Sequence, residues 1–350
     1  MASGYKFYSK PEYLKDLIKR FSAAGPGDRL VLATMALNVT YPLVNEVIEA
    51  LCQAAARGAQ VSLAVDANTF LAYEHSVRFG PLFWRNRLHS HMSGRYQPQF
   101  EALKKLQASG GKYVITNLPA RPFTRPFAGR SHIKYAVVNE RLYIGGCNID
   151  AAEQVDLMVG WDDKRATDWV YGWTKKVMAK QNTRLAARGQ DLSCKLKDGS
   201  ILMIDCGLPR QSLILKTALD IIDRAQKSIF VSFAYTPTRV VLKHLKTAFR
   251  RGVNITLIYN HPSKYGAFSL LHAVAGMRER VRTPKLLLAN RRLKSARTLH
   301  AKLITTEDCT IIGSHNFVAE GVNFGTAEIA LVNYSPDFAR QALAALKKQL

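Results

Sequence analysis

The sequence predicts an α/β protein made of two similar halves, and three observations support this prediction. The chain has 350 residues, which is long for one domain because domains usually span roughly 100–200 residues. A strand–helix–strand pattern occurs in residues 29–66 and again in residues 228–260. A His-x-Lys sequence follows each copy of this pattern, at His132 and at His300.

Each copy of the pattern has the same order of elements: strand, loop, amphipathic helix, an Arg-Gly pair and a second strand. Runs rich in β-branched residues predict the strands. Between them Val47, Ile48 and Leu51 recur at helical spacing, and Gly58 and Gly252 stand where each helix should end. Helices that alternate with strands in this way cover the faces of a sheet, which defines the α/β class.

The two halves are expected to meet in residues 181–199, which are polar, basic and weakly periodic. A helix is predicted just before them, over residues 166–180. We therefore place the domain boundary between residues 1–185 and residues 186–350.

The composition is that of a globular protein without a metal cluster or a membrane span. Apolar residues make up 47% and charged residues 22% of the chain, which excludes a disordered or collagen-like protein. The apolar runs are shorter than the roughly 18–20 residues that a membrane span needs, and the first residues lack the apolar core of a secretory signal. The five cysteines have no C-x-x-C spacing, so we expect neither a zinc site nor a disulfide framework. These features predict a cytoplasmic protein.

The net charge predicts a polyanionic partner. Fifty Lys and Arg residues against 26 Asp and Glu residues give a formal charge of +24. Residues 76–130 contain ten basic residues and a single acid, and residues 278–302 contain nine basic residues and a single acid. An anionic membrane surface and a nucleic acid both fit this charge, so the charge alone leaves both partners open.

The first half carries an insertion in which aromatic and basic residues are interleaved. The distance from Gly58 to His132 is 74 positions, but the distance from Gly252 to His300 is only 48, and residues 79–100 account for the excess. Such a segment suits a bilayer interface, stacking on single-stranded bases, or a loop packed on the core. The residues predicted to contact a membrane are Phe79, Leu82, Phe83, Trp84, Arg85 and Arg87.

Both His-x-Lys sequences are predicted to lie on hairpins. Alternate side chains of a strand face the same way, so each histidine projects together with its lysine, Lys134 or Lys302. The strand then turns, at residues 139–141 or 307–308, and returns beside the histidine. An asparagine lies sixteen positions after each histidine, at Asn148 and at Asn316.

Small residues on the returning strands allow a ligand to approach the backbone closely. Gly146 and Ser314 occupy equivalent positions there and are predicted to bind the substrate. A histidine, an ammonium group and an amide together suit the charge and the acceptor atoms of a phosphate. Two such sets would form one site.

Two histidines in one site can transfer a phosphoryl group without a metal or another cofactor. One neutral imidazole attacks phosphorus, while the other, protonated, gives its proton to the leaving oxygen. The lysines and asparagines would hold the non-bridging oxygens. Each histidine also needs a partner that fixes its tautomer, and Asp156 and Glu328, which follow their histidines by 24 and 28 residues, are the predicted partners.

The remaining histidines lack this context and are expected at the surface or in packing contacts. They are His75, His89, His91, His244, His261, His272 and His315.

These paired motifs resemble those of the phospholipase D superfamily, which has two H-x-K-x4-D sequences, each followed by a G-S or G-G pair and an asparagine. The resemblance covers essentially the whole chain. It implies two phospholipase D-like domains, each a central mixed β-sheet flanked by helices, with a metal-free active site at their interface. It also implies that His132 is the nucleophile and His300 the acid–base group, although the two roles are interchangeable. Asn139 and Glu307 replace the aspartate of each motif, and we expect both to lie at the turns, away from the phosphate.

The pairs Gly145-Gly146 and Gly313-Ser314, followed by a strand that bears Glu328, look like those of bacterial cardiolipin synthases. This implies transfer of a phosphatidyl group between phospholipids, through a phosphohistidine, at the inner face of the cell membrane. The alternatives are a nuclease that acts on nucleic acid, a phospholipase D that releases phosphatidic acid, and a non-catalytic module that binds lipid or nucleic acid. Both motifs lie in one chain, so an oligomer is not required.

Overall fold

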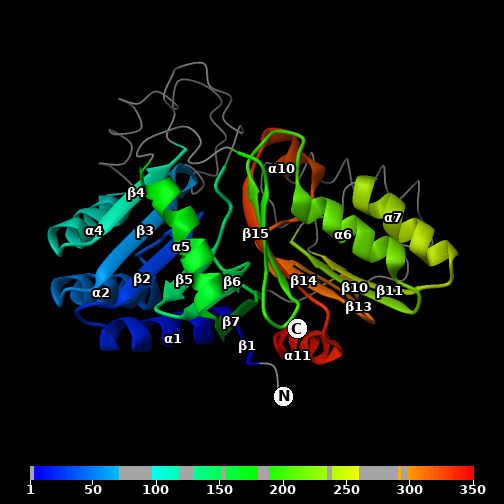
Figure 1. Cartoon of the computed structure of the whole chain (residues 1–350), viewed down its shortest axis with the longest axis horizontal. Helices are drawn as coiled ribbons and strands as arrows, with labels where there is room; N and C mark the ends of the chain where they lie inside the picture. Colours follow the sequence, from blue (N-terminus) through cyan, green and yellow to red (C-terminus); the bar gives the residue numbers. More distant parts are fainter. Residues whose placement is uncertain are drawn as a thin grey trace.

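The computed structural model shows two similar halves, each a mixed β-sheet flanked by helices (Figure 1). It describes residues 4–70, 97–117, 130–151, 154–179, 189–234, 239–259, 291–292 and 298–350. The predicted domain boundary at residues 185 and 186 lies outside these ranges, and so do the six residues predicted to contact a membrane.

The first sheet has seven strands in the order β1-β7-β6-β5-β2-β3-β4. Strands β2, β3 and β4 are parallel, and the other pairs are antiparallel. The strands are β1 (Lys6–Tyr8), β2 (Arg29–Thr34), β3 (Gln60–Asp66), β4 (Lys112–Thr116), β5 (Tyr135–Val138), β6 (Arg141–Gly145) and β7 (Met158–Asp162).

The second sheet has eight strands in the order β12-β11-β10-β13-β14-β15-β9-β8. With β8 left aside, this order is that of the first sheet, so the repeat in the sequence is a repeat of topology. The strands are β8 (Leu192–Lys195), β9 (Ile201–Cys206), β10 (Ser228–Phe233), β11 (Asn254–Tyr259), β12 (Arg291–Arg292), β13 (Leu303–Thr306), β14 (Thr310–Gly313) and β15 (Ala327–Asn333).

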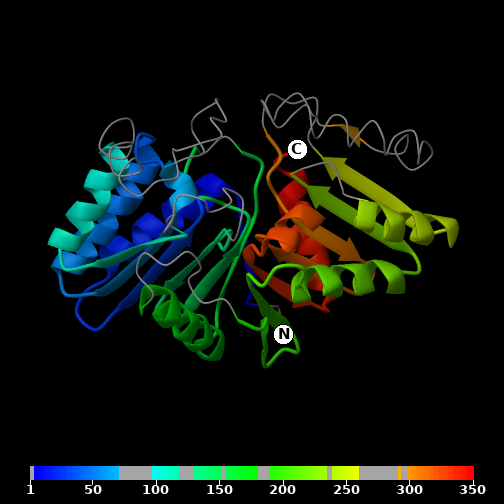
Figure 2. The same ribbon diagram turned by 90° about the horizontal axis from the view of Figure 1, so that it is seen from above.

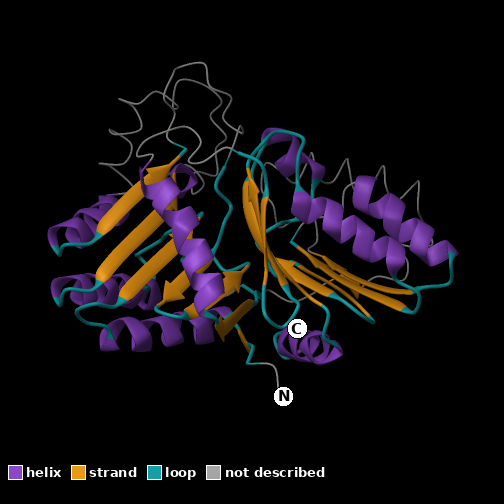
Figure 3. Ribbon diagram, in the orientation of Figure 1, coloured by secondary structure: helices purple, strands orange, loops and turns teal. Residues whose placement is uncertain are grey.

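Helices cover the outer face of each sheet, and a shared core, which includes side chains of α5 and α11, lies between the sheets (Figures 2 and 3). The helices of the first half are α1 (Lys10–Ala23), α2 (Pro42–Ala56), the 3-10 turn η1 (Ala67–Phe70), α4 (Gln97–Ala108) and α5 (Lys164–Ala179). Those of the second half are α6 (Leu213–Arg224), α7 (Arg239–Arg250), α10 (Ala319–Phe324) and α11 (Pro336–Lys347). None of the helices in the described ranges has both the length and the apolar character needed to cross a membrane.

The shared core joins the two halves into one unit. Apolar side chains from β2, β5, β6 and β7 and from β9, β13, β14 and β15 form a single buried cluster with α5 and α11. Val31 and Ile144 contribute from the first sheet, and Ile204 and Leu331 from the second. Each such side chain contributes about 1.5–3 kcal/mol when it is fully buried, so the interface between the halves is a substantial part of the fold.

The predicted helix ends are confirmed and both hairpins form, but the prediction that each histidine and its lysine lie in the first strand is wrong: His132 and Lys134 precede β5, and His300 and Lys302 precede β13. The predicted helix over residues 166–180 is α5, and Gly58 and Gly252 take left-handed φ values of 95° and 88° shortly after α2 and α7. Strands β5 and β6 form one hairpin, and β13 and β14 form the other.

Asn139 and Glu307 lie at the hairpin turns, as expected, and tie them to the sheet. Asn139, at φ 55°, accepts a hydrogen bond from the Arg29 N–H at 2.9 Å. The Glu307 carboxylate accepts three, from the backbone N–H groups of Gln226, Lys227 and Ser228, at 2.6, 3.0 and 3.1 Å. The acidic position of each motif therefore holds the hairpin against the start of β2 or β10.

Replacing Glu307 by alanine should lower the free energy of unfolding by about 1–3 kcal/mol, because three backbone donors lose their acceptor. Urea denaturation measures this loss. The control is Asp308→Ala at the exposed neighbouring position, which should change the value by less than about 0.5 kcal/mol. Equal losses in the two variants would contradict this role of Glu307.

Candidate active site

Backbone hydrogen bonds between the two halves hold the two His-x-Lys segments in place. The His132 N–H donates to the carbonyl of Ala327 at 2.9 Å, and the His300 N–H donates to the carbonyl of Val155 at 2.8 Å. Parallel bridges at Ser131 and at Leu299 accompany these bonds. Each acceptor residue directly precedes the carboxylate residue of its own half. The two motifs therefore meet at the interface of the halves.

Each histidine is paired with a carboxylate of the other half. His132 Nδ1 lies 2.9 Å from Glu328 Oε2, and His300 Nδ1 lies 2.5 Å from Asp156 Oδ2. The prediction that each carboxylate serves the histidine of its own half is wrong, because the backbone bridges exchange the partners. A carboxylate at Nδ1 assigns the proton to that nitrogen and leaves Nε2 of both rings available for chemistry.

Burial sets the charge state of the two pairs. Burial alone would raise the pKa of Asp156 and of Glu328, but the facing histidines, the nearby lysines and hydrogen bonds lower both to about 2. Burial lowers the pKa of His132, and it lowers that of His300 to about 3, against the attraction of their carboxylates. Near neutral pH the carboxylates are therefore ionised and the imidazoles neutral.

Lys134 and Lys302 are fully buried beside the histidines. Lys134 Nζ donates to the carbonyl of His132 at 2.8 Å, and Lys302 Nζ donates to the carbonyl of His300. Burial, and then repulsion from Lys302, lower the pKa of Lys134 to about 7, and burial lowers that of Lys302 to about 8. An anion between the two ammonium groups would relieve both effects, so the site is built to receive one.

The two predicted asparagines have buried oxygens without a hydrogen-bond partner among the described residues. These atoms are Oδ1 of Asn148 and Oδ1 of Asn316. Buried polar atoms are almost always paired. These two atoms only accept hydrogen bonds, so a ligand that pairs with them supplies a donor such as a hydroxyl group, and the phosphate oxygens do not.

Gly146 and Ser314, the predicted substrate-binding residues, lie against the carboxylates. A Cβ atom at position 146 would collide with the carboxylate of Asp156. Ser314 is fully buried, and its hydroxyl donates to Glu328 Oε2. We interpret both positions as holding the carboxylates in place. Gly146 leaves room for Asp156, and Ser314 donates a hydrogen bond to Glu328.

His315 is buried and packs against Phe317, at 5.2 Å between ring centroids, so of its two expected places the packing contact is confirmed. Its side chain is 3% exposed, and Glu328 and His132 lie within electrostatic reach of it. Its Nδ1 accepts a hydrogen bond from the Phe317 N–H at 2.7 Å, which assigns its proton to Nε2. Burial lowers its pKa to about 4, so the ring is a neutral donor. Its place directly before Asn316 was the signal in the sequence.

Two further clusters support the motifs and were not found from the sequence. The Asp66 carboxylate accepts hydrogen bonds from the Ser131 N–H at 2.8 Å and from Asn117 at 2.5 Å, and so anchors the segment that leads into His132. Lys10, fully buried, forms an ion pair with Asp150, two residues after Asn148. The partners in each cluster are 51 or more positions apart, and no spacing pattern connects them.

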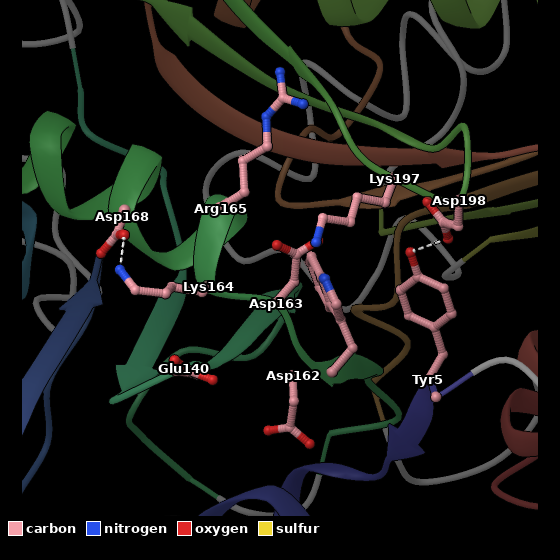
Figure 4. A pocket seen from close by; sticks show the side chains of 11 residues that line it. Tyr5, Glu140, Asp162, Asp163, Lys164, Arg165, Asp168, Lys197 and Asp198 are labelled. Atoms are coloured by element: carbon pink, nitrogen blue, oxygen red, sulfur yellow. Dashed lines mark hydrogen bonds and ion pairs between the residues drawn. The ribbon is translucent and has the colours of Figure 1, made fainter.

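A second hollow, with a volume of about 650 Å³, lies between the start of α5 and the turn that joins β8 to β9 (Figure 4). Several of its polar side chains pair with each other or with the backbone. Tyr5 donates to Asp198 at 2.7 Å, Lys164 donates to Asp168 at 2.6 Å, and Asp163 accepts from the Ala166 N–H. No residue of either histidine motif lines it, so we do not assign catalysis to this hollow.

The geometry is matched by one family and by solved structures. The family described as "Cardiolipin synthase, PLD-like domain" matches residues 17–177 and 218–350. No curated protein sequence matches the chain.

Two solved structures share the fold. The phosphatidylserine synthase of Haemophilus influenzae Rd KW20 is 15% identical, with a TM-score of 0.70, over 100% of this chain and 86% of that one. The polyphosphate kinase of Porphyromonas gingivalis is 13% identical, with a TM-score of 0.56, over 99% of this chain and 50% of that one. At these identities the likeness concerns the fold alone.

Sulfate, whose charge is constant near neutral pH, should bind more weakly as pH rises through about 7 to 8. Lys134 and Lys302 lose their protons in that range when the site is empty, and an anion binds the protonated forms. Binding near pH 7.5 should therefore be accompanied by proton uptake, which titration calorimetry in two buffers of different ionisation enthalpy measures. Lys134→Met should reduce the uptake, whereas the exposed Lys19→Met should not. A pH-independent affinity would contradict the assignment.

Proposed function

The chain belongs to the phospholipase D superfamily, in the family of PLD-like domains of cardiolipin synthase, and on this premise we propose that it is a phosphatidyltransferase that works through a phosphohistidine. The observation that carries the proposal is the pair of histidine–carboxylate dyads, His132–Glu328 and His300–Asp156, at one interface with two buried lysines. A site that only bound phosphate would need the cations but not two imidazoles with fixed tautomers.

In the first step, Nε2 of His132 attacks the phosphorus of a phospholipid. The bond from phosphorus to the leaving oxygen breaks, and His300, protonated at Nε2, gives that oxygen its proton. The phosphatidyl group is then bound to the ring nitrogen of His132. The negative charge of the incoming phosphodiester favours the protonated form of one imidazole, which burial disfavours in the empty site.

In the second step the roles reverse. His300, now neutral, takes the proton from the hydroxyl group of the acceptor, and the acceptor oxygen attacks phosphorus. The bond from phosphorus to nitrogen breaks and His132 is free again. Glu328 and Asp156 stabilise the positive charge that each ring carries in turn, and Lys134 and Lys302 stabilise the negative charge on the non-bridging oxygens.

We propose that the substrates are phospholipids and that the acceptor is phosphatidylglycerol or a related alcohol, which makes the product cardiolipin or a related lipid. The family description and the phospholipid synthase among the fold neighbours support this choice. We further propose peripheral association with the inner face of the cell membrane, which the excess positive charge supports.

The proposal predicts that the purified protein, incubated in EDTA with phosphatidylglycerol vesicles, alone or with phosphatidylethanolamine, forms cardiolipin. Mass spectrometry of the lipids measures it. His132→Ala and His300→Ala should form none, and Asp156→Asn should form about 10²–10⁴-fold less, because His300 loses its charged partner. The exposed Asp168→Asn is the matched control and should retain activity. Phosphatidic acid without cardiolipin would make the protein a phospholipase, and untouched lipid with cleaved single-stranded nucleic acid would make it a nuclease.

The assignment of His132 as the nucleophile predicts a difference between the two histidine variants. A phosphodiester with a p-nitrophenol leaving group needs no proton from the enzyme, so His300→Ala should still release a burst of p-nitrophenol and accumulate a phosphohistidine. His132→Ala should release no burst, because no covalent bond forms. Stopped-flow absorbance and peptide mass spectrometry measure the two results, and a burst from His132→Ala alone would exchange the roles.

A further inference from the structure

Helix α7 carries a line of basic residues and no acidic residue. Arg239, Lys243, Lys246 and Arg250 follow one another at intervals of four, three and four. At 100° per residue these positions lie within about 60° of one another around the helix axis. Lys243 and Arg250 are exposed, and Lys246 is partly exposed. We call Lys243, Lys246 and Arg250 the basic ridge.

The ridge faces away from the sheet. The opposite side of α7 consists of Val241, Leu242, Leu245 and Ala248, which are buried in the core of the second half. Phe249, 41% exposed, lies about 100° around the helix axis from Arg250, next to the apolar side of α7. On the neighbouring helix α6, Asp223 is paired with His244 at 2.8 Å.

The fold does not require this charge. Helix α2 holds the equivalent place in the first half, between the two parallel strands that correspond to β10 and β11. It contains Glu46 and Glu49 and no lysine or arginine. Like charges three and four positions apart also destabilise a helix. The ridge is therefore a feature that the second half carries in addition to what its architecture needs.

Helix α7 starts near the active-site edge of the second sheet, and the ridge lies farther along the helix. Strand β10 leads into α7, and near its end Ser232 Oγ donates to the carbonyl of Ala301, between His300 and Lys302, at 3.0 Å. From there α7 runs about 16 Å along the outer side of the second half (Figures 1 and 2).

We propose that the basic ridge of α7 is the surface on which the protein docks to an anionic phospholipid bilayer. This inference rests on the proposed function, in which the substrate lies in such a bilayer. The exposed Lys243 and Arg250, with the partly exposed Lys246 between them, complement an extended plane of phosphate groups. Each cation at such a surface adds about fivefold to the affinity.

The test is binding to sucrose-loaded vesicles by sedimentation, which needs no turnover. On vesicles of phosphatidylglycerol and phosphatidylcholine, Lys243→Glu/Arg250→Glu should bind at least about 30-fold more weakly than the wild-type chain. The matched control is Lys15→Glu/Lys19→Glu on α1, which removes the same charge from exposed positions and should weaken binding less than about threefold. On phosphatidylcholine alone all three proteins should bind weakly.

Hydrolysis of a small soluble phosphodiester separates this inference from the proposed function, because it requires the active site but no membrane. The α7 variant should keep the wild-type rate on it. Equal loss of vesicle binding in both double variants would overturn the inference, because the net charge of the protein and not the ridge would then determine binding. Unchanged vesicle binding by the α7 variant would also overturn it, and if that variant lost binding to single-stranded DNA instead, the ridge would be a nucleic-acid surface.

Discussion

The active site depends on the reciprocal backbone pairing of the two halves. Each histidine segment leaves its own sheet and is hydrogen-bonded to the other half, His132 to Ala327 and His300 to Val155. Glu328 directly follows Ala327, and Asp156 directly follows Val155. The two backbone bonds therefore set both histidine–carboxylate distances. The halves cannot move apart without separating both dyads, so the shared core between the sheets serves catalysis as well as stability. Neither half contains a complete histidine–carboxylate dyad by itself.

Burying the charged and polar groups of the active site costs free energy. Lys134 and Lys302 are buried close enough to repel each other, and the amide oxygens of two asparagines lack donors. Burial lowers the pKa of both lysines, although the ionised carboxylates of Glu328 and Asp156 act against this shift. In our proposal the negative charge of a bound phosphodiester stabilises the protonated lysines further, so binding offsets part of the free energy that their burial costs.

The sequence was sufficient for the fold class and for the residues of the two motifs, because both are encoded locally. Strand periodicity, a glycine after each helix and a fixed His-to-Asn spacing all lie within short stretches. The pairing of the carboxylates was not predictable in the same way. Asp156 is 24 residues from His132 and 144 from its true partner, His300, and only the backbone pairing of the two halves at their interface selects the latter. Asp66 and Lys10 were missed for the same reason, since each acts on a motif that is distant in the sequence.

The two halves share one topology, so a difference between equivalent positions is not required by the fold and points to a role of the residue itself. Gly146 faces the short acid Asp156, and Ser314 faces the longer Glu328. Exchanging only the small residues would create a collision in one half and an unpaired carboxylate oxygen in the other, so each pair works as a unit. The helices α2 and α7 hold equivalent places and differ in the same way: α2 carries Glu46 and Glu49, whereas α7 carries the basic ridge. Where two equivalent positions differ and the local fold does not, the difference reflects what each half contacts: a carboxylate in the first case and, in our proposal, a lipid bilayer in the second.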